Sequence, residues 1–271
     1  MTDPAADPLA DQHAALTYTS YLALEEVLDA QRPRSDEHDE MLFIVIHQVY
    51  ELWFKQFLHE LEHLQRKLEK IDTAHSVRTL RRVLTILKVV VAQIDVLETM
   101  TPRQFTSFRT RLDAASGFQS GQFREIEAVL GRRDRRAFQH YPEGSEARER
   151  ISAAMSRRTL FDSFLHYLAG SGYDVPAEHL ERDVREPWTE SEAVQRILVQ
   201  VYHDDAGPST VADLLVDLDE GMQEWRYRHV KMVERTIGAK AGTGGSAGAK
   251  YLRTTLFHAV FPDLWAVRSE L

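Results

Sequence analysis

Three histidines lie in the stretch FIVIHQVYELWFKQFLHELEH, residues 43–63, and two of them fall in a pattern that could carry chemistry. The closing HELEH matches H-E-x-x-H, a pattern in which two histidines bind zinc and the glutamate acts as a general base. On a helix that advances about 100° per residue, however, His59 and His63 face away from the apolar stripe that contains Tyr50. We therefore interpret HELEH as a solvent-exposed polar face and reject the zinc site.

Two other histidines lie on apolar stripes of predicted helices. His47 follows Phe43 by one turn, and His229 is central in a helix predicted over 209–237. The second stripe is spaced alternately by four and three residues: Val211, Leu215, Leu218, Met222, Trp225, His229, Met232 and Thr236. Burying an imidazole costs free energy unless its nitrogens find partners. The partner is either a backbone carbonyl or a metal, for which neutral imidazole is the commonest ligand.

The pattern of donors favours haem iron over zinc. The chain has no cysteine and no convincing carboxylate cluster, and the two histidines come from different long helices. A cavity between helices lined by Phe, Trp, Met and Leu suits a porphyrin with one axial histidine and a second side polar enough to bind substrate.

A glycine-rich segment near the end of the chain, GTGGSA at 242–247, matches G-x-G-x-x-A only loosely. A helix precedes it where a dinucleotide-binding motif requires a strand, so we do not assign that function. Two interpretations stay open. The segment is a flexible connection between helices, or it is a mobile lid whose Thr243 or Ser246 hydroxyl donates to a carboxylate.

Helical periodicity dominates the whole chain and strand-like alternation is almost absent, which predicts an all-α bundle with long helices around the haem pocket. We expect a disordered tail over 1–16 and a single domain over 17–271. Helices are predicted over 21–30, 35–71, 77–100, 145–157, 160–169, 190–203 and 209–237.

Three helix starts carry capping signals. Ser35 is the predicted cap of the helix that contains His47. Thr101-Pro102-Arg103-Gln104 combines a threonine cap, a proline at the first helical position and a capping-box glutamine. Thr189 with Glu192 predicts a third capping box.

Composition excludes several classes of protein. Of the 271 residues 43% are hydrophobic and 28% are charged, and the net charge of −9 argues against a nucleic-acid partner or an anionic membrane. The lack of cysteine removes disulfides and thiolate nucleophiles. We find neither a signal-peptide pattern nor an apolar run long enough to span a bilayer, so we expect a cytoplasmic protein.

Four segments together resemble one family. In chain order they are FIVIHQVYELWFKQ, SGFQSGQFR, EWRYRHV and RTIG followed by GTGGS, and with their separations they are similar to tryptophan 2,3-dioxygenase from about Thr17 to Trp265. The resemblance implies an all-helical homotetramer with haem b, ferrous in its active form. It also implies an activity that inserts both atoms of O₂ into the indole of L-tryptophan to give N-formylkynurenine, the first step of the kynurenine route.

The resemblance also assigns roles around the iron and the indole. It makes His229 the proximal axial ligand of the haem iron and His47 the catalytic distal residue that hydrogen-bonds the indole N–H. Phe43 packs on the indole, and Ser116 and Gly117 lie close over the haem.

A second set of roles concerns the rest of the substrate. By the same resemblance Arg109 takes the substrate carboxylate, and Thr243 contacts the amino-acid head group from the closing loop. Phe105 stands where members carry tyrosine or phenylalanine. Tyr18 and Tyr21 belong to the segment that completes the pocket of a neighbouring subunit.

Some positions depart from the family pattern toward smaller side chains: Gly121, Ala239, Ala241 and Ala247. They leave an alternative open, a tailoring relative that oxidises a substituted tryptophan and adds one oxygen to give an oxindole. A further alternative is a haem-binding sensor without turnover. Arg109 and Thr243 argue against the sensor, because it has no need of an amino-acid clamp.

Overall fold

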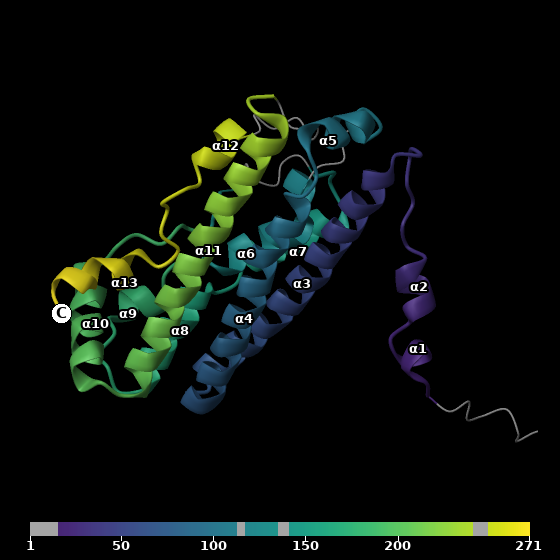
Figure 1. Ribbon diagram of the computed structural model, residues 1–271. Helices are drawn as coiled ribbons and strands as arrows, with labels where there is room; N and C mark the ends of the chain where they lie inside the picture. Colours follow the sequence, from purple (N-terminus) through teal and green to yellow (C-terminus); the bar gives the residue numbers. More distant parts are fainter. Residues whose placement is uncertain (1–15, 113–116, 135–140, 241–248) are drawn as a thin grey trace, which may run out of the picture.

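The computed structural model describes four stretches of the chain: 16–112, 117–134, 141–240 and 249–271. Within these stretches every regular element is a helix, which confirms the all-α prediction (Figure 1).

Three long helices form the frame of the fold: α3 (His38–Glu69), α4 (Thr73–Leu97) and α11 (Gly207–Ile237). Helix α4 packs along both of the others, so the three lie side by side as a layer (Figure 1). At Gly221 a side chain would bring its Cβ within 2.7 Å of a Leu87 methyl carbon. Glycine therefore lets α11 approach α4 closely at this point.

The buried faces of these helices are the apolar stripes that the sequence shows. On α3 the stripe is fully or nearly buried: Ile46, Tyr50, Phe54, Phe57, Leu61, Leu64 and Leu68. On α11 the buried members are Val211, Leu215, Leu218, Met222 and Trp225. Each fully buried side chain of this size stabilises the fold by about 1.5–3 kcal/mol relative to an exposed one.

Shorter helices surround the frame: α1 (Tyr18–Tyr21), α2 (Leu24–Leu28), α5 (Pro102–Arg109), α6 (Gly121–Val129), α7 (Glu146–Met155), α8 (Leu160–Gly170), α9 (Ala177–Leu180), α10 (Glu192–Asp204), α12 (Ala249–Arg253) and α13 (Pro262–Ala266). Two 3₁₀ turns, η1 (Gly117–Gln119) and η3 (Val267–Ser269), complete the elements of the described stretches. Helices α5, α6 and α8 all pack on α3.

One of the three predicted caps is confirmed and two are wrong. Thr101 and Gln104 form a capping box at the start of α5. Helix α3 begins at His38 and Ser35 does not cap it. Instead the Glu40 carboxylate reaches back and accepts from Ser35 Oγ at 2.5 Å. At α10 the cap is Ser191 rather than Thr189, because the Ser191 hydroxyl accepts from the backbone N–H three residues later.

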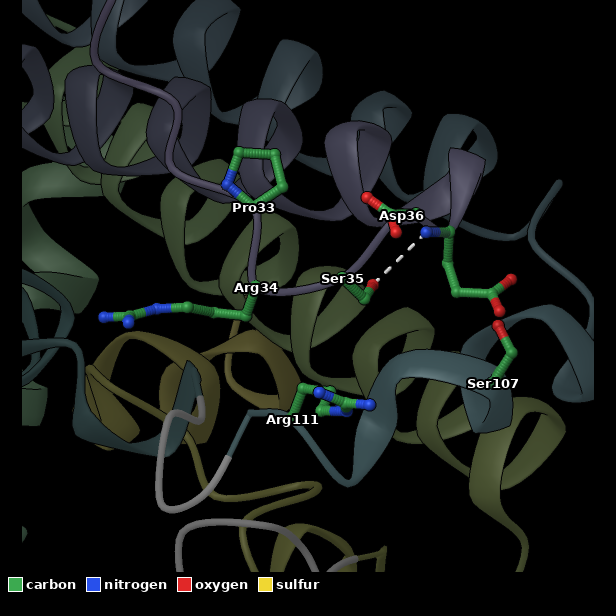
Figure 2. A pocket seen from close by; sticks show the side chains of 7 residues that line it. Pro33, Arg34, Ser35, Asp36, Ser107 and Arg111 are labelled. Carbon is green, nitrogen blue, oxygen red and sulfur yellow. Dashed lines mark hydrogen bonds between the residues drawn. The ribbon is translucent and has the colours of Figure 1, made fainter.

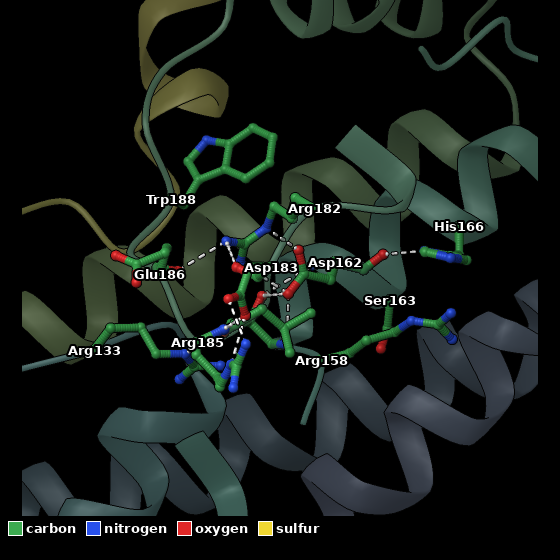
Figure 3. A network of polar contacts seen from close by, with 12 residues as sticks. Arg133, Arg158, Asp162, Ser163, His166, Arg182, Asp183, Arg185, Glu186 and Trp188 are labelled. Carbon is green, nitrogen blue, oxygen red and sulfur yellow. Dashed lines mark hydrogen bonds and ion pairs between the residues drawn. The ribbon is translucent and has the colours of Figure 1, made fainter. Parts of the chain in front are cut away.

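Buried arginines and aspartates connect the shorter helices (Figure 3). Asp162 on α8 accepts from Arg182 Nε at 2.6 Å and from its Nη2 at 3.0 Å. Arg133 donates to the carbonyls of Ala128 and Arg157, near the ends of α6 and α7. Burial lowers the pKa of Arg133 to about 10, so the side chain remains charged at neutral pH. These contacts hold α6 in place, and α6 supports the site described below.

The N-terminal helices α1 and α2 form an arm that stands away from the rest of the chain (Figure 1). Ala23, with a φ of 48°, separates them, so the single helix predicted over 21–30 is wrong. The arm carries exposed apolar side chains, among them Tyr18 and Tyr21, which are 76% and 71% exposed. At its base Gln31 donates to Gln48 of α3 at 2.7 Å. The predicted tail over 1–16 lies almost entirely outside the described residues.

Candidate active site

The two stripe histidines, His47 on α3 and His229 on α11, lie near enough to interact electrostatically. The pKa of His229 is lowered to about 4; burial is the largest cause, and the charges of His47 and Arg124 contribute the rest. By exposed area both residues are only half-buried. His229 is therefore neutral at physiological pH and has a lone pair available for a metal.

The protonation of His47 is set by its own helix. Its Nδ1 lies 2.7 Å from the carbonyl oxygen of Phe43, so Nδ1 carries the proton and donates to that oxygen. Burial lowers the pKa of His47, although the Phe43 carbonyl and Glu51 oppose this effect, and the ring stays neutral. Nε2 is then an acceptor, and it can receive an N–H from a ligand.

Gly117 lies beside that acceptor nitrogen. A Cβ added to Gly117 would be 3.9 Å from His47 Nε2 and would fill the space next to it. The turn η1 thus brings the backbone of a distant segment close to His47, and glycine keeps the approach to Nε2 open.

Aromatic rings form one wall of the site. Phe43 lies 4.2 Å from His47 and 5.6 Å from Phe105, measured between ring centroids. Phe108, which sequence reasoning did not assign to the site, contacts Phe43 at 5.7 Å and Phe105 at 5.5 Å. The sequence signal that could have assigned Phe108 to the site is its position three residues after Phe105, on the same face of one helix. The wall suits a flat aromatic ligand.

A second aromatic wall surrounds His229. Trp225 lies 5.0 Å from His229, and Phe123 of α6 lies 4.5 Å from Trp225. Phe54 of α3 packs on Phe123 at 5.5 Å. Helices α3, α6 and α11 therefore meet behind this histidine.

Polar residues border the same region. Arg109 is half-buried in the last turn of α5, the helix that supplies Phe105. Gln122 Nε2 donates to the Glu51 carboxylate at 2.8 Å and to the Glu51 carbonyl at 2.9 Å. Gln122 was not predicted to belong to the site, and no local sequence pattern identifies it as a site residue. The contact ties α6 to α3 one turn beyond His47.

Two other predicted site residues that the structure describes lie away from this place. Tyr18 and Tyr21 are on the exposed arm. Thr243 and Ser116 lie outside the described residues, as do Ser246, Ala241 and Ala247.

The small residue at Gly121 has a structural explanation. A Cβ there would come within 2.8 Å of the Ala147 Cβ, so glycine permits close packing of α6 on α7. The departure at Gly121 from the larger family residue therefore lies at the contact of α6 with α7.

The HELEH segment lies in the second half of α3. No group of three His, Cys, Asp or Glu side chains that could hold a metal occurs in the part of the chain that the structure describes. His59 is exposed, as predicted. Glu60, by contrast, is 4% exposed and accepts from Gln56 at 2.8 Å and Arg82 at 3.1 Å, so a fully solvated face was the wrong interpretation.

A separate hollow of about 460 Å³ lies between the segment before α3 and the far side of α5 (Figure 2). Ser107 lines it, and Ser107 is about 200° around the helix from Phe105. Its other lining residues are Pro33, Arg34, Ser35, Asp36, Glu37 and Arg111. This exposed, polar hollow is distinct from the aromatic site.

The residues present fit a haem. His229 is a neutral imidazole that belongs to no group of three or more His, Cys, Asp or Glu side chains in the described stretches, and a porphyrin supplies the remaining in-plane nitrogen ligands itself. The Trp225 Nε1 beside it is buried and has no hydrogen-bond partner among the described residues. Buried donors are normally paired, so this atom is placed to donate to a bound group.

The fold and site together define an all-helical protein whose neutral histidines and aromatic side chains suit a haem and a flat substrate. Comparison with known proteins narrows this class: the sequence profile described as tryptophan 2,3-dioxygenase matches residues 5–170 and 179–271. The chain belongs to the tryptophan 2,3-dioxygenase family, which confirms the resemblance.

Individual relatives are similar to this chain over nearly their whole lengths. The protein named tryptophan 2,3-dioxygenase in Anaeromyxobacter sp. (strain K) is 63% identical over 273 residues, which cover 100% of both chains. The protein of that name in Herpetosiphon aurantiacus is 56% identical and covers 95% of this chain and 99% of its own. The one in Arthrobacter sp. (strain FB24) is 40% identical and covers 98% and 95%.

Proposed function

We propose that this chain is a haem-dependent enzyme that oxidises the indole ring of L-tryptophan with O₂ and inserts both oxygen atoms to give N-formylkynurenine. The observation that carries the proposal is the 63% identity, over the whole of both chains, to a protein named tryptophan 2,3-dioxygenase. The neutral histidine pair and the Phe43 wall support it.

The cofactor is haem b, held by His229 through its neutral imidazole. When bound as ferrous haem, it supplies the reactivity toward O₂ that a closed-shell indole lacks. Family members depend on haem, and the lone imidazole with its buried neighbour Trp225 is a suitable holder.

Residues of α3 and α5 orient the indole. Nε2 of His47 accepts the indole N–H, because Nδ1 is committed to the Phe43 carbonyl. Phe43 and Phe105 pack on the indole faces and exclude water from the reacting carbons. Gly117 leaves the room that this placement needs.

Two further residues recognise the amino-acid head group. Arg109 binds the carboxylate through its guanidinium fork, a geometry that favours two parallel hydrogen bonds. Thr243, from the glycine-rich lid, contacts the head group and closes the site. Helix α12, just past that segment, is tied to α11 by Arg253, whose Nε lies 2.6 Å from Glu234 Oε1.

The active assembly is a homotetramer in which the arm of one subunit covers the pocket of another. The arm carries exposed apolar side chains, among them Tyr18, Tyr21 and Leu28. Such side chains support the proposal that the arm packs against another subunit. Residues 17–271 form one domain. Within the described stretches, no helix combines the length and apolarity needed to cross a bilayer. A cytoplasmic location stays a prediction.

The tailoring and sensor alternatives have no observation in their favour. The relatives at 63%, 56% and 40% identity all carry the same name. Gly121, one of the departures behind the tailoring alternative, packs against α7.

A single-turnover assay with ¹⁸O₂ and L-tryptophan tests the function. The expected product is N-formylkynurenine that contains two labelled oxygens. One labelled oxygen in an oxindole, or turnover only with a substituted tryptophan, would support the tailoring alternative. Binding of tryptophan without O₂ consumption would support the sensor.

A further inference from the structure

A buried ionic cluster lies behind the site, centred on Glu127 of α6. The Glu127 side chain is 4% exposed, and its carboxylate lies 2.5 Å from Arg124 Nη1, 2.9 Å from Arg132 Nη1 and 3.9 Å from Arg226 Nη2. The three arginine side chains are 7%, 24% and 12% exposed. Burial raises the pKa of Glu127, but the three arginines lower it more, so the carboxylate is charged.

The cluster connects the helices that carry the two sides of the site. Arg226 belongs to α11 and precedes His229 by three residues, about one turn. Arg124 belongs to α6, which directly follows the turn that places Gly117 beside His47. Glu127 therefore binds a residue from each helix at once. Arg226 also donates to the carbonyl of His258 at 3.1 Å, which attaches the C-terminal segment to the same point.

The cluster is within electrostatic reach of His229. Phe123, which precedes Arg124, packs on Trp225, and Trp225 lies 5.0 Å from His229. Arg124 Cζ itself lies 5.8 Å from the centroid of the Phe123 ring, in the same stack of side chains. In a site of low dielectric, a charge in this neighbouring layer of side chains changes the electrostatic potential at any group that the imidazole binds.

We propose that Glu127 is a positioning residue of the haem site: by holding Arg124 and Arg226 it fixes α6 against α11 and sets how much positive charge the iron on His229 experiences. The inference rests on the proposed function. A nearby positive charge stabilises ferrous relative to ferric iron and raises the reduction potential, and a nearby negative charge lowers it. Glu127 and Arg124 thus act on the potential in opposite directions.

The test is the midpoint potential of the haem-loaded full chain, followed through its Soret band. Glu127→Gln removes a negative charge and keeps the shape, so the potential should rise. Arg124→Gln removes a positive charge, so the potential should fall. Glu125→Gln is the matched control, because it makes the same chemical change on the same helix at a carboxylate that pairs with Arg150 instead. The control should leave the potential close to that of wild type.

Shifts of the same sign in both variants, or no shift in either, would overturn the proposal, since a purely structural role affects stability without opposite effects on the iron. If Glu127→Gln does not fold, Arg124→Lys and Arg124→Gln carry the test. The lysine variant should keep the wild-type potential and the glutamine variant should lower it. Equal potentials in these two would contradict the inference.

The proposed function fails separately. Wild-type protein that binds no haem, or haem that stays bound after His229 is removed, would refute the assignment of the iron ligand before any potential is compared. Haem on His229 with potentials that do not depend on Glu127 and Arg124 would refute only the role of the cluster.

Discussion

Nδ1 of His47 lies 2.7 Å from the carbonyl oxygen of Phe43, one helical turn earlier on α3. A carbonyl oxygen has two lone pairs, so it can accept from the imidazole as well as from the helix backbone. This contact assigns the proton to Nδ1 and leaves Nε2 as an acceptor. The backbone of α3 thereby orients the ring for a ligand N–H beside Gly117.

Removing His47 tests its proposed role. His47→Ala should lower kcat/KM for L-tryptophan by roughly 10- to 100-fold, which is the loss of about 1–3 kcal/mol expected for one hydrogen bond in a buried site. Steady-state kinetics with 1-methyltryptophan, which has no indole N–H, provides the comparison. An equal loss with both substrates would contradict the hydrogen bond.

Removing His229 tests the iron ligand. His229→Ala should abolish the Soret band of the purified protein, because the substitution removes the imidazole that is proposed to hold the haem iron. His59→Ala, an exposed histidine on α3, is the control and should keep full haem content. An unchanged spectrum in His229→Ala would refute the assignment.

Two glycine substitutions distinguish an effect on the candidate site from an effect on helix packing. Gly117→Ala places a Cβ about 3.9 Å from His47 Nε2, so KM for tryptophan should rise several-fold at constant haem content. Gly121→Ala places a Cβ 2.8 Å from the Ala147 Cβ, so Tm should fall with little change in KM. Measured KM and Tm values that follow the reverse pattern would refute the placement of Gly117.

Glu40 predicts a pH dependence of stability. Burial raises the pKa of Glu40, but hydrogen bonds from Ser35 and Arg34 outweigh this effect, and the net pKa is below 4.5. The unfolded chain then binds more protons near and below pH 4.5, so the stabilisation is present above that value and is lost as the pH falls through the folded pKa.

Glu40→Gln should therefore destabilise the protein at pH 7 by about 1.5–3 kcal/mol, the range for hydrogen bonds to a charged group. Denaturant unfolding at a series of pH values should show this difference shrinking below pH 4.5. Glu37→Gln, whose side chain makes no cap bond, is the control and should have little effect. A difference that does not vary with pH would count against a charged Glu40.

The arm predicts an effect on assembly. Deleting residues 1–22 removes Tyr18 and Tyr21, which are exposed in the single chain. Light scattering should show a smaller or looser assembly, and activity should fall while haem stays bound. A truncated monomer with full activity would rule out the proposed completion of a neighbouring pocket.

The sequence by itself determined the helical class and the direction that side chains take on each helix. The stripes on α3 and α11 are buried as their spacing predicts, and His47 and His229 lie on them. This succeeds because the 3.6-residue period fixes each side chain relative to its own helix. The capping box at Thr101 was predictable too, because its hydrogen bonds join residues only three positions apart.

Only the tertiary structure decided which side chains meet across helices. The helical period places Glu60 on the polar face of α3, yet Arg82 of α4 covers its side chain. Gly121 meets Ala147, and Gly117 meets His47, because of how α6 and the turn before it dock. Glu127 gathers arginines from two elements far apart in the chain. Such contacts depend on how the helices are aligned with one another and on the path of the loops between them. Both are decided by the packing of the whole chain, so no periodic pattern within a single segment predicts them.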